Sequence, residues 1–140
     1  VVHDDNAHAM GGVCGHAGLF GTVENVKRLL MMLQKGHIGK SDATIFTPKL
    51  IRNFFKRPSK NGRPLGFDAP ACNQSSSGTR FSPQSVGHLG FTGTSFWVDL
   101  KKETIVILLT NRIHPHRYNN AIRQFRPRIH DAVMVALGTK

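Results

Sequence analysis

The chain has 140 residues, of which 39% are hydrophobic, so it can bury the core of one compact domain. Its 19 Lys and Arg residues against 8 Asp and Glu give a net charge of +11, which permits binding to nucleic acid or to an anionic membrane surface. No apolar run reaches the roughly 18 residues that span a bilayer, so the sequence predicts no transmembrane segment.

The basic residues are spread along the chain, and no aromatic-basic motif, zinc-finger spacing or helix-turn-helix pattern accompanies them. This distribution favours a solvated basic surface, and we expect no nucleic-acid partner. A basic nucleic-acid-binding protein is the alternative, and steeply salt-dependent DNA binding would identify it.

The first segment, from His3 to Phe20, is rich in glycine, histidine and small residues, which predicts a loop. Imidazole and thiolate groups are the preferred ligands of zinc, so its histidines and Cys14 raise the question of a metal site. Their spacing matches neither Cys-x-x-Cys nor His-Glu-x-x-His, and we expect neither a metal nor a cofactor. The ligands considered are His3, His8, Cys14 and His16.

Two helices are predicted next. Thr22 can cap a helix from Val23 to about Lys35, which Gly36 would end. Thr47 and Pro48 form a second start signal, a capping residue followed by proline at the first helical position. The apolar stripes of the two helices are Val26, Leu29, Leu30 and Leu33, then Leu50, Ile51, Phe54 and Phe55.

The stretch from Arg57 to Pro83 is polar and contains several prolines, which predicts a long irregular connection. Within it, only Leu65 to Phe67 is typical of the start of a strand. The run Ser75-Ser76-Ser77 is expected to be a mobile surface loop and not to contain a nucleophile.

Three short strands are predicted between Ser85 and Pro115. They run through His88 to Gly90, Ser95 to Val98, and Ile105 to Leu109, and the last two form an antiparallel hairpin. Glycines at positions 87, 90 and 93 indicate close backbone approach or a bulge along the first strand. The chain then ends in a helix, with Pro127 at its start and Asp131 in its first turn.

The strand region also carries a family resemblance. It reads Gly87-His88-Leu89-Gly90-Phe91-Thr92-Gly93-Thr94-Ser95, and the apolar strand after it ends in Leu109-Thr110-Asn111-Arg112-Ile113-His114-Pro115. Together with the glycine-rich segment before the first helix and with Leu65 to Asp68, this resembles the serine β-lactamase and penicillin-binding-protein-like family. The match is to the C-terminal part of the class C-like branch, which includes esterases and D-alanyl peptidases.

The resemblance implies an α+β fold with antiparallel strands and flanking helices. Residues 1–140 would be the C-terminal portion of a single catalytic domain: a glycine-rich loop and helices over 1–60, an irregular connection over 61–84, sheet strands over 85–115 and a terminal helix over 116–140. A periplasmic or extracellular location is suggested by the resemblance alone. Cys14 and Cys72 leave both a disulfide and two free thiols open.

The family's nucleophile is the serine of a Ser-x-x-Lys motif, but no serine of this chain has lysine three residues later. The pattern Tyr118-Asn119-Asn120 follows the His-Leu-Gly strand, whereas the family's Tyr-x-Asn motif precedes it. The chain therefore resembles the second half of a serine hydrolase. Its expected partner is the N-terminal half of the same domain or a second copy of the chain, because three strands would leave an unpaired edge.

The resemblance carries the family's Lys-Thr-Gly motif onto His88, Leu89 and Gly90. The backbone N–H of Phe91 would then stabilise the oxyanion of acyl transfer, and Thr92 and Thr94 would line the substrate cleft. Because His88 is largely neutral near pH 7 and Leu89 lacks a hydroxyl, neither anchors a substrate carboxylate. We therefore expect small-molecule or peptide esters and amides to be preferred over β-lactams. A non-catalytic, penicillin-recognising-like binding domain is the other alternative.

Overall fold

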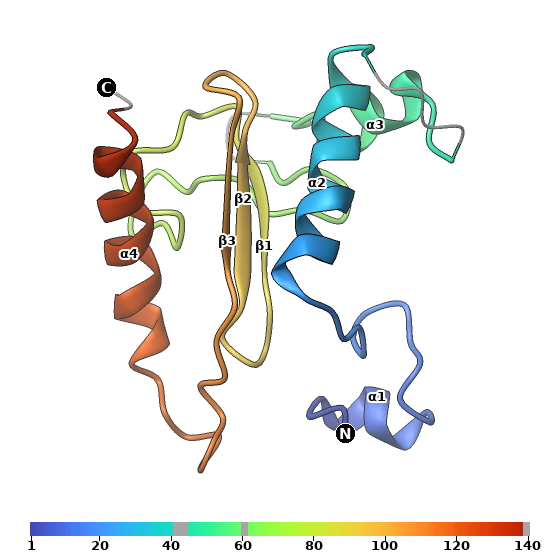
Figure 1. Ribbon diagram of the computed structural model, residues 1–140, viewed down its shortest axis with the longest axis vertical. Helices are drawn as coiled ribbons and strands as arrows, with labels where there is room; N and C mark the ends of the chain where they lie inside the picture. Colours follow the sequence, from blue (N-terminus) through green and yellow to red (C-terminus); the bar gives the residue numbers. More distant parts are fainter. Residues whose placement is uncertain (41–44, 60–61, 139–140) are drawn as a thin grey trace.

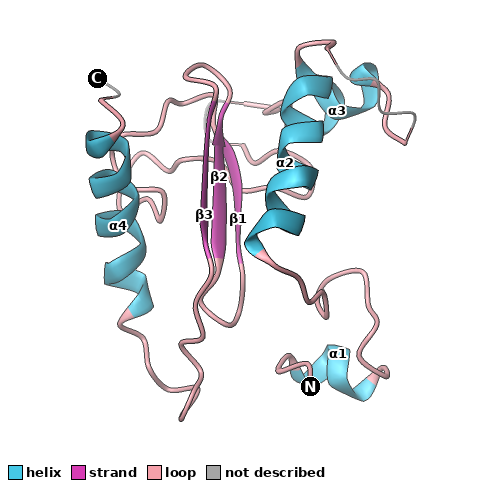
Figure 2. Cartoon of the chain, in the orientation of Figure 1, coloured by secondary structure: helices cyan, strands magenta, loops and turns pink. Residues whose placement is uncertain are grey.

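The computed structural model describes residues 1–40, 45–59 and 62–138. Their elements form three layers, in which a central sheet has helices α2 and α3 on one face and helix α4 on the other (Figures 1 and 2). The expected α+β class is therefore confirmed. In chain order the elements are α1 (Asp5–Ala9), α2 (Val23–His37), α3 (Pro48–Phe55), β1 (Val86–Leu89), β2 (Ser95–Asp99), β3 (Thr104–Leu108) and α4 (Ile122–Ala136).

The sheet has the order β1-β2-β3, and both strand pairs are antiparallel. Each predicted strand is present, although β1 begins two residues before the predicted start at His88 and β3 begins and ends one residue early. Helices cover both faces, which explains why β3 is almost wholly apolar instead of alternating. Residues 65–67 form no strand; Gly66 has a positive φ of 71° in a turn there, and only Asp68 forms a bridge, to Gly87.

The sheet separates two hydrophobic clusters. One lies on the side of α2 and α3, and the other contains Trp97 and Met134, both fully buried, on the side of α4. Alternate residues of each strand contribute to alternate clusters, as the pleat requires. The buried members are Leu30, Ile51, Phe55, Val86 and Val98 in the first cluster, and Phe81, Trp97, Val106 and Met134 in the second.

Helix α2 begins as predicted, with a capping box between Thr22 and Asn25. The predicted end at Gly36 is wrong, because the helix continues through this buried glycine to His37. The residue that ends it is Gly39, with φ of 75°, and the Lys40 N–H closes the last turn on the Lys35 carbonyl. Helix α3 begins at Pro48 as predicted, but Leu50 and Phe54 stay exposed in an open apolar groove.

The predicted start of α4 at Pro127 is also wrong. The helix begins at Ile122, so Pro127 lies inside it and Asp131 lies in its middle. The buried stripe of this helix, Ile122, Arg126, His130 and Met134, has the spacing i, i+4, i+8, i+12, but two of its members are polar. Those two residues conceal the helical pattern in the sequence.

Two predicted loops are more ordered than expected. Residues 5–9 form the short helix α1, whose first turn is capped by the Asp4 side chain. Ser77 is fully buried, with its hydroxyl 2.7 Å from the Ser75 hydroxyl, so the triple-serine segment is not a surface loop. Asp131 fixes this segment to α4 by accepting hydrogen bonds from the N–H groups of Thr79 and Arg80 at 2.7 and 3.1 Å.

Cys14 and Cys72 form no disulfide. Within residues 1–40, 45–59 and 62–138, no three His, Cys, Asp or Glu side chains lie close enough together to hold a metal ion. Over the same residues, no helix is long and apolar enough to cross a membrane.

Asp99 organises the turn between β2 and β3 and is fully buried. Its carboxylate accepts hydrogen bonds from the Ser82 hydroxyl at 2.6 Å, the Ser82 N–H at 2.7 Å, and the N–H groups of Lys101 and Lys102, both at 3.0 Å. Burial acts to raise the pKa of Asp99, but these hydrogen bonds outweigh it and the pKa is lowered.

We predict that Asp99→Asn destabilises the chain by about 2 kcal/mol or more. The carboxylate accepts from four donors, whereas the NH2 group of asparagine is itself a donor and would face one or more of them. Chemical unfolding at pH 7 measures the change. Glu24→Gln makes the same change from carboxylate to amide in an exposed ion pair of α2, and it should cost less than about 0.5 kcal/mol. Equal losses in the two variants would contradict the assigned role of Asp99.

Candidate functional site

The candidate site is the turn that joins β1 to β2. The Gly90 N–H donates to the Thr94 carbonyl at 2.8 Å, and the Gly93 N–H donates to the Gly90 carbonyl at 3.1 Å. Gly93 has a φ of 102°, a conformation that residues with a Cβ rarely adopt. The turn is therefore tight, and its shape depends on glycine.

The open edge of β1 lies beside this turn. The N–H and C=O groups of Gly87 pair with Asp68 at 2.9 and 2.6 Å, so they point away from β2. Since backbone groups alternate along a strand, those of Leu89 point to the same outer edge. Beyond Asp68, no backbone group of the described residues pairs with this edge, and only the His88 imidazole contacts the Leu89 carbonyl, so an extended ligand can still pair there.

The sequence-predicted residues lie on both sides of the strand. His88 is exposed, and its Nδ1 lies 2.9 Å from the Leu89 carbonyl. The Leu89 side chain packs on the Trp97 cluster, on the α4 side of the sheet. A cavity of about 440 Å³ brings together all six predicted residues: His88, Leu89, Gly90, Phe91, Thr92 and Thr94.

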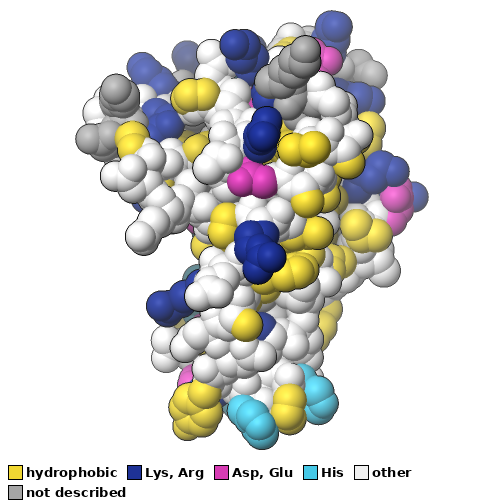
Figure 3. All heavy atoms as spheres, turned by 90° about the vertical axis from the view of Figure 1, so that its left-hand side faces the viewer, with side chains coloured by type: hydrophobic (Ala, Val, Ile, Leu, Met, Phe, Trp, Pro, Cys, Tyr) yellow, Lys and Arg dark blue, Asp and Glu magenta, His cyan; other side chains and the backbone are white. Residues whose placement is uncertain are grey.

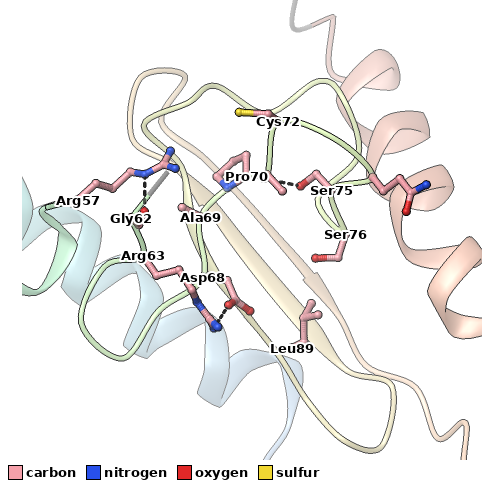
Figure 4. Close-up of a pocket in the computed structure, with 12 residues that line it drawn as sticks. Arg57, Gly62, Arg63, Asp68, Ala69, Pro70, Cys72, Ser75, Ser76 and Leu89 are labelled. Carbon is pink, nitrogen blue, oxygen red and sulfur yellow. Dashed lines mark hydrogen bonds and ion pairs between the residues drawn. The ribbon is translucent and has the colours of Figure 1, made fainter. Parts of the chain in front are cut away.

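A second cavity, of about 600 Å³, lies on the other side of Leu89. Figure 4 shows the Leu89 side chain pointing toward the loop that carries Ser75 and Ser76. An ion pair between Arg63 and Asp68 lies in the wall of this second cavity. The cavities meet at Leu89, so the edge of β1 has space on both sides.

Two arginines from the segment after β3 contact Phe91. The guanidinium carbons of Arg112 and Arg117 lie 5.0 and 5.5 Å from the centre of its ring, as in cation–π contacts. The Arg112 Nε also donates to the Phe91 carbonyl at 2.9 Å, and Arg117 forms an ion pair with Asp5. The turn therefore lies in a positive environment.

A third arginine, Arg126 of α4, was missed by the sequence reasoning. Its side chain is buried, and its Nη2 donates to the carbonyls of Gly90 and Thr94, both at 2.8 Å. Its Nε donates to the Gly93 carbonyl at 3.2 Å. The signal that could have identified it is its place on the stripe of Ile122 and Met134.

His130 and Ser95 form a second polar pair, between the sheet and α4. The Ser95 hydroxyl lies 3.1 Å from His130 Nε2, and His130 Nδ1 lies 2.9 Å from the Ser76 carbonyl. A serine, a histidine and a group that orients the histidine have the arrangement of an activated nucleophile. However, His130 is fully buried and Ser95 is 4% exposed, so the pair serves the packing of α4 and not catalysis.

Burial lowers the pKa of His130, and the nearby Arg126 lowers it further. The Ser76 carbonyl and Asp131 oppose the shift without cancelling it. Burial likewise lowers the pKa of His37. Both histidines are therefore more easily protonated in the unfolded chain than in the folded one.

Comparisons with known proteins show which family and which proteins the chain is similar to. The family model described as Beta-lactamase matches residues 1–129. A protein of Escherichia coli O157:H7, provisionally named a D-alanyl-D-alanine carboxypeptidase, is 33% identical over 118 residues, which are 81% of this chain and 27% of that protein. A protein of the same name from Salmonella agona is 33% identical over 117 residues, with the same coverage. The chain thus spans about a quarter of the length of these curated relatives.

A solved structure agrees at the level of the fold. A β-lactamase from Mycobacterium bovis superimposes with a TM-score of 0.66 and 20% sequence identity. The superposition covers 86% of this chain and 46% of that one. At this identity the likeness concerns the fold alone.

We predict that the free energy of unfolding decreases as the pH falls through 6.5, the ordinary pKa of histidine, because protonation then favours the unfolded chain. Each histidine can contribute at most about 1.4 kcal/mol per pH unit. Thermal unfolding between pH 7.5 and 5.0 measures the dependence. His130→Asn should flatten it, and adding His37→Asn should flatten it further. An unchanged slope in both variants would contradict the prediction.

Proposed function

The chain belongs to the beta-lactamase family, and on this premise we propose that it provides the ligand-facing strand and one oxyanion donor of a serine hydrolase acting by acyl transfer. The observation that carries the proposal is the backbone around Phe91. A tetrahedral oxyanion needs N–H donors that are aimed at it and not used elsewhere. Among the described residues, the Phe91 N–H makes no hydrogen bond.

The direction of this N–H supports the assignment. The Gly90–Phe91 peptide is trans, so its C=O and N–H groups point in opposite directions. The Gly90 carbonyl points into the turn, toward Arg126 and Gly93. The Phe91 N–H therefore points out of the turn, toward the edge that Leu89 presents.

The charges near Phe91 favour the same chemistry. Arg112 and Arg117 lie against its ring, and because Arg117 forms an ion pair with Asp5, Arg112 contributes most of the positive charge near a developing negative charge. Fixed positive charge at such a position stabilises the transition state more than the neutral substrate.

The nucleophile is not provided by a Ser-x-x-Lys motif of this chain. Ser95 pairs with His130 but is buried, and Ser41 lies outside the described residues. We therefore assign the nucleophile to a further part of the polypeptide or to a partner chain. Such a chain would supply the second oxyanion N–H together with the serine.

The residues before Phe91 suggest the substrate class. His88 stands in the open cavity where the family has a lysine, and Leu89 stands where it has a hydroxyl residue. The His88 side chain carries no permanent positive charge and the Leu89 side chain has no O–H donor, so neither is suited to bind a substrate carboxylate. We propose that short esters and amides are preferred over β-lactams.

If the assignment of the nucleophile is right, the 140-residue chain forms no covalent adduct with a fluorophosphonate or a penicillin. Intact mass spectrometry before and after treatment measures this. The penicillin-binding core of a complete family member serves as the positive control. An adduct on any serine of this chain would overturn the assignment.

The oxyanion role of Phe91 is tested separately, with a phosphonate monoester as a stable tetrahedral anion. Titration into the 15N-labelled chain should shift the amide signals of Leu89, Phe91 and Thr92 in a saturable way. Phe91→Ala keeps the N–H and should keep the response of its neighbours, whereas Phe91→Pro removes the N–H and should abolish it. The proposed role fails if the proline variant responds like the alanine variant while the sheet signals of both are intact.

A further inference from the structure

Arg126 holds the turn between β1 and β2 through three backbone carbonyls. Its side chain is 7% exposed, so its charge is almost out of contact with water. A buried guanidinium must find hydrogen-bond acceptors, and Gly90, Gly93 and Thr94 provide one each, at 2.8, 3.2 and 2.8 Å. The hydrogen bonds of the Arg126 guanidinium are thus made to this turn.

One of these acceptors belongs to the peptide that carries the candidate oxyanion donor. The carbonyl of Gly90 and the N–H of Phe91 are the two ends of a single rigid plane. Fixing the carbonyl on the Arg126 guanidinium therefore also fixes the direction of the N–H. We propose that Arg126 is a positioning residue, which aims the Phe91 N–H away from α4 and out of the turn; this inference rests on the proposed function.

The alternative orientation of the peptide shows why an arginine suits this position. If the plane flipped, the Phe91 N–H would face the guanidinium of Arg126. Arginine has five N–H donors and no acceptor, so the two donors would oppose each other. The Gly93 N–H would also lose the Gly90 carbonyl that it contacts at 3.1 Å. Both effects favour the orientation in which Phe91 faces outward.

Arg112 provides a matched comparison within the same turn. It is also an arginine, and its Nε donates to the Phe91 carbonyl at 2.9 Å. That carbonyl shares its plane with the N–H of Thr92, so Arg112 restrains the next peptide. The two arginines therefore act on neighbouring peptide planes, and only Arg126 acts on the plane of the Phe91 N–H.

The experiment measures N–H directions by residual dipolar couplings, and their rigidity by 15N relaxation, in the 140-residue chain. In the unsubstituted chain, the Phe91 coupling should agree with the orientation in the structure, with an order parameter of about 0.85. Arg126→Met should move the coupling and lower the order parameter below about 0.6. Arg112→Met should change the Thr92 coupling and leave that of Phe91 unchanged.

Arg126→Lys covers the case in which the methionine variant does not fold. A lysine keeps the charge but lacks the planar fork that reaches several carbonyls at once. Its Phe91 order parameter should lie between those of the unsubstituted chain and of the methionine variant. An unchanged Phe91 coupling and order parameter in a folded Arg126 variant would overturn the inference.

The outcome is independent of the proposed function. The couplings are measured without ligand, so they report on Arg126 alone. If Arg126 proves to set the Phe91 direction while the phosphonate titration of the unsubstituted chain shows no response, the positioning holds and the oxyanion role fails. If the phosphonate shifts the amide signals but the Phe91 coupling is unchanged in the Arg126 variants, the oxyanion role holds and the positioning is overturned.

Discussion

Burial of both faces of a three-stranded sheet is the constraint on which the rest of the structure depends. Trp97 and Val98 are neighbours on β2, yet both are almost fully buried, because one faces α4 and the other faces α2 and α3. Each cluster depends on its own helix layer, α2 and α3 for the first and α4 for the second. The strand residues are consequently apolar on both sides, and the functional groups of the sheet are drawn from its backbone and its turns.

Three ionisable side chains buried in this core, those of Asp99, Arg126 and His130, bind backbone groups. Asp99 holds the N–H groups of one turn, His130 holds the Ser76 carbonyl, and Arg126 holds the carbonyls of the turn beside the candidate site. Each contact satisfies a buried polar group and at the same time fixes an irregular segment on the sheet. Helix α4 contributes two of the three, so its packing and the geometry of the site are linked.

The positive charges behind the net charge of +11 are dispersed over part of the surface and clustered at one turn. On the face of the molecule that α4 covers, Lys and Arg side chains are spread among uncharged ones (Figure 3). At the turn between β1 and β2, by contrast, Arg112, Arg117 and Arg126 converge through Phe91 and its neighbours. This convergence, and not the total charge, bears on the chemistry proposed for the site.

The sequence by itself determined the elements whose signals are local. Thr22 as a cap, and Thr47 followed by Pro48, predict the starts of α2 and α3. The apolar run of β3 predicts both ends of that strand to within one residue, whereas α2 continues two residues beyond its predicted end. The motif around His88 also predicted the family, because its glycines and its order along the chain are specific. The candidate site residues could be named for the same reason.

Only the tertiary structure decided the rest, because those features depend on contacts between distant residues. The start of α4 was misplaced because Arg126 and His130 are polar in sequence but buried by partners 32 to 54 residues away. Ser77 was expected in a surface loop, but it is fully buried in a segment whose Ser76 carbonyl contacts His130 of the same helix. The direction of the Phe91 N–H likewise depends on a guanidinium from another element, and no local pattern encodes such a contact.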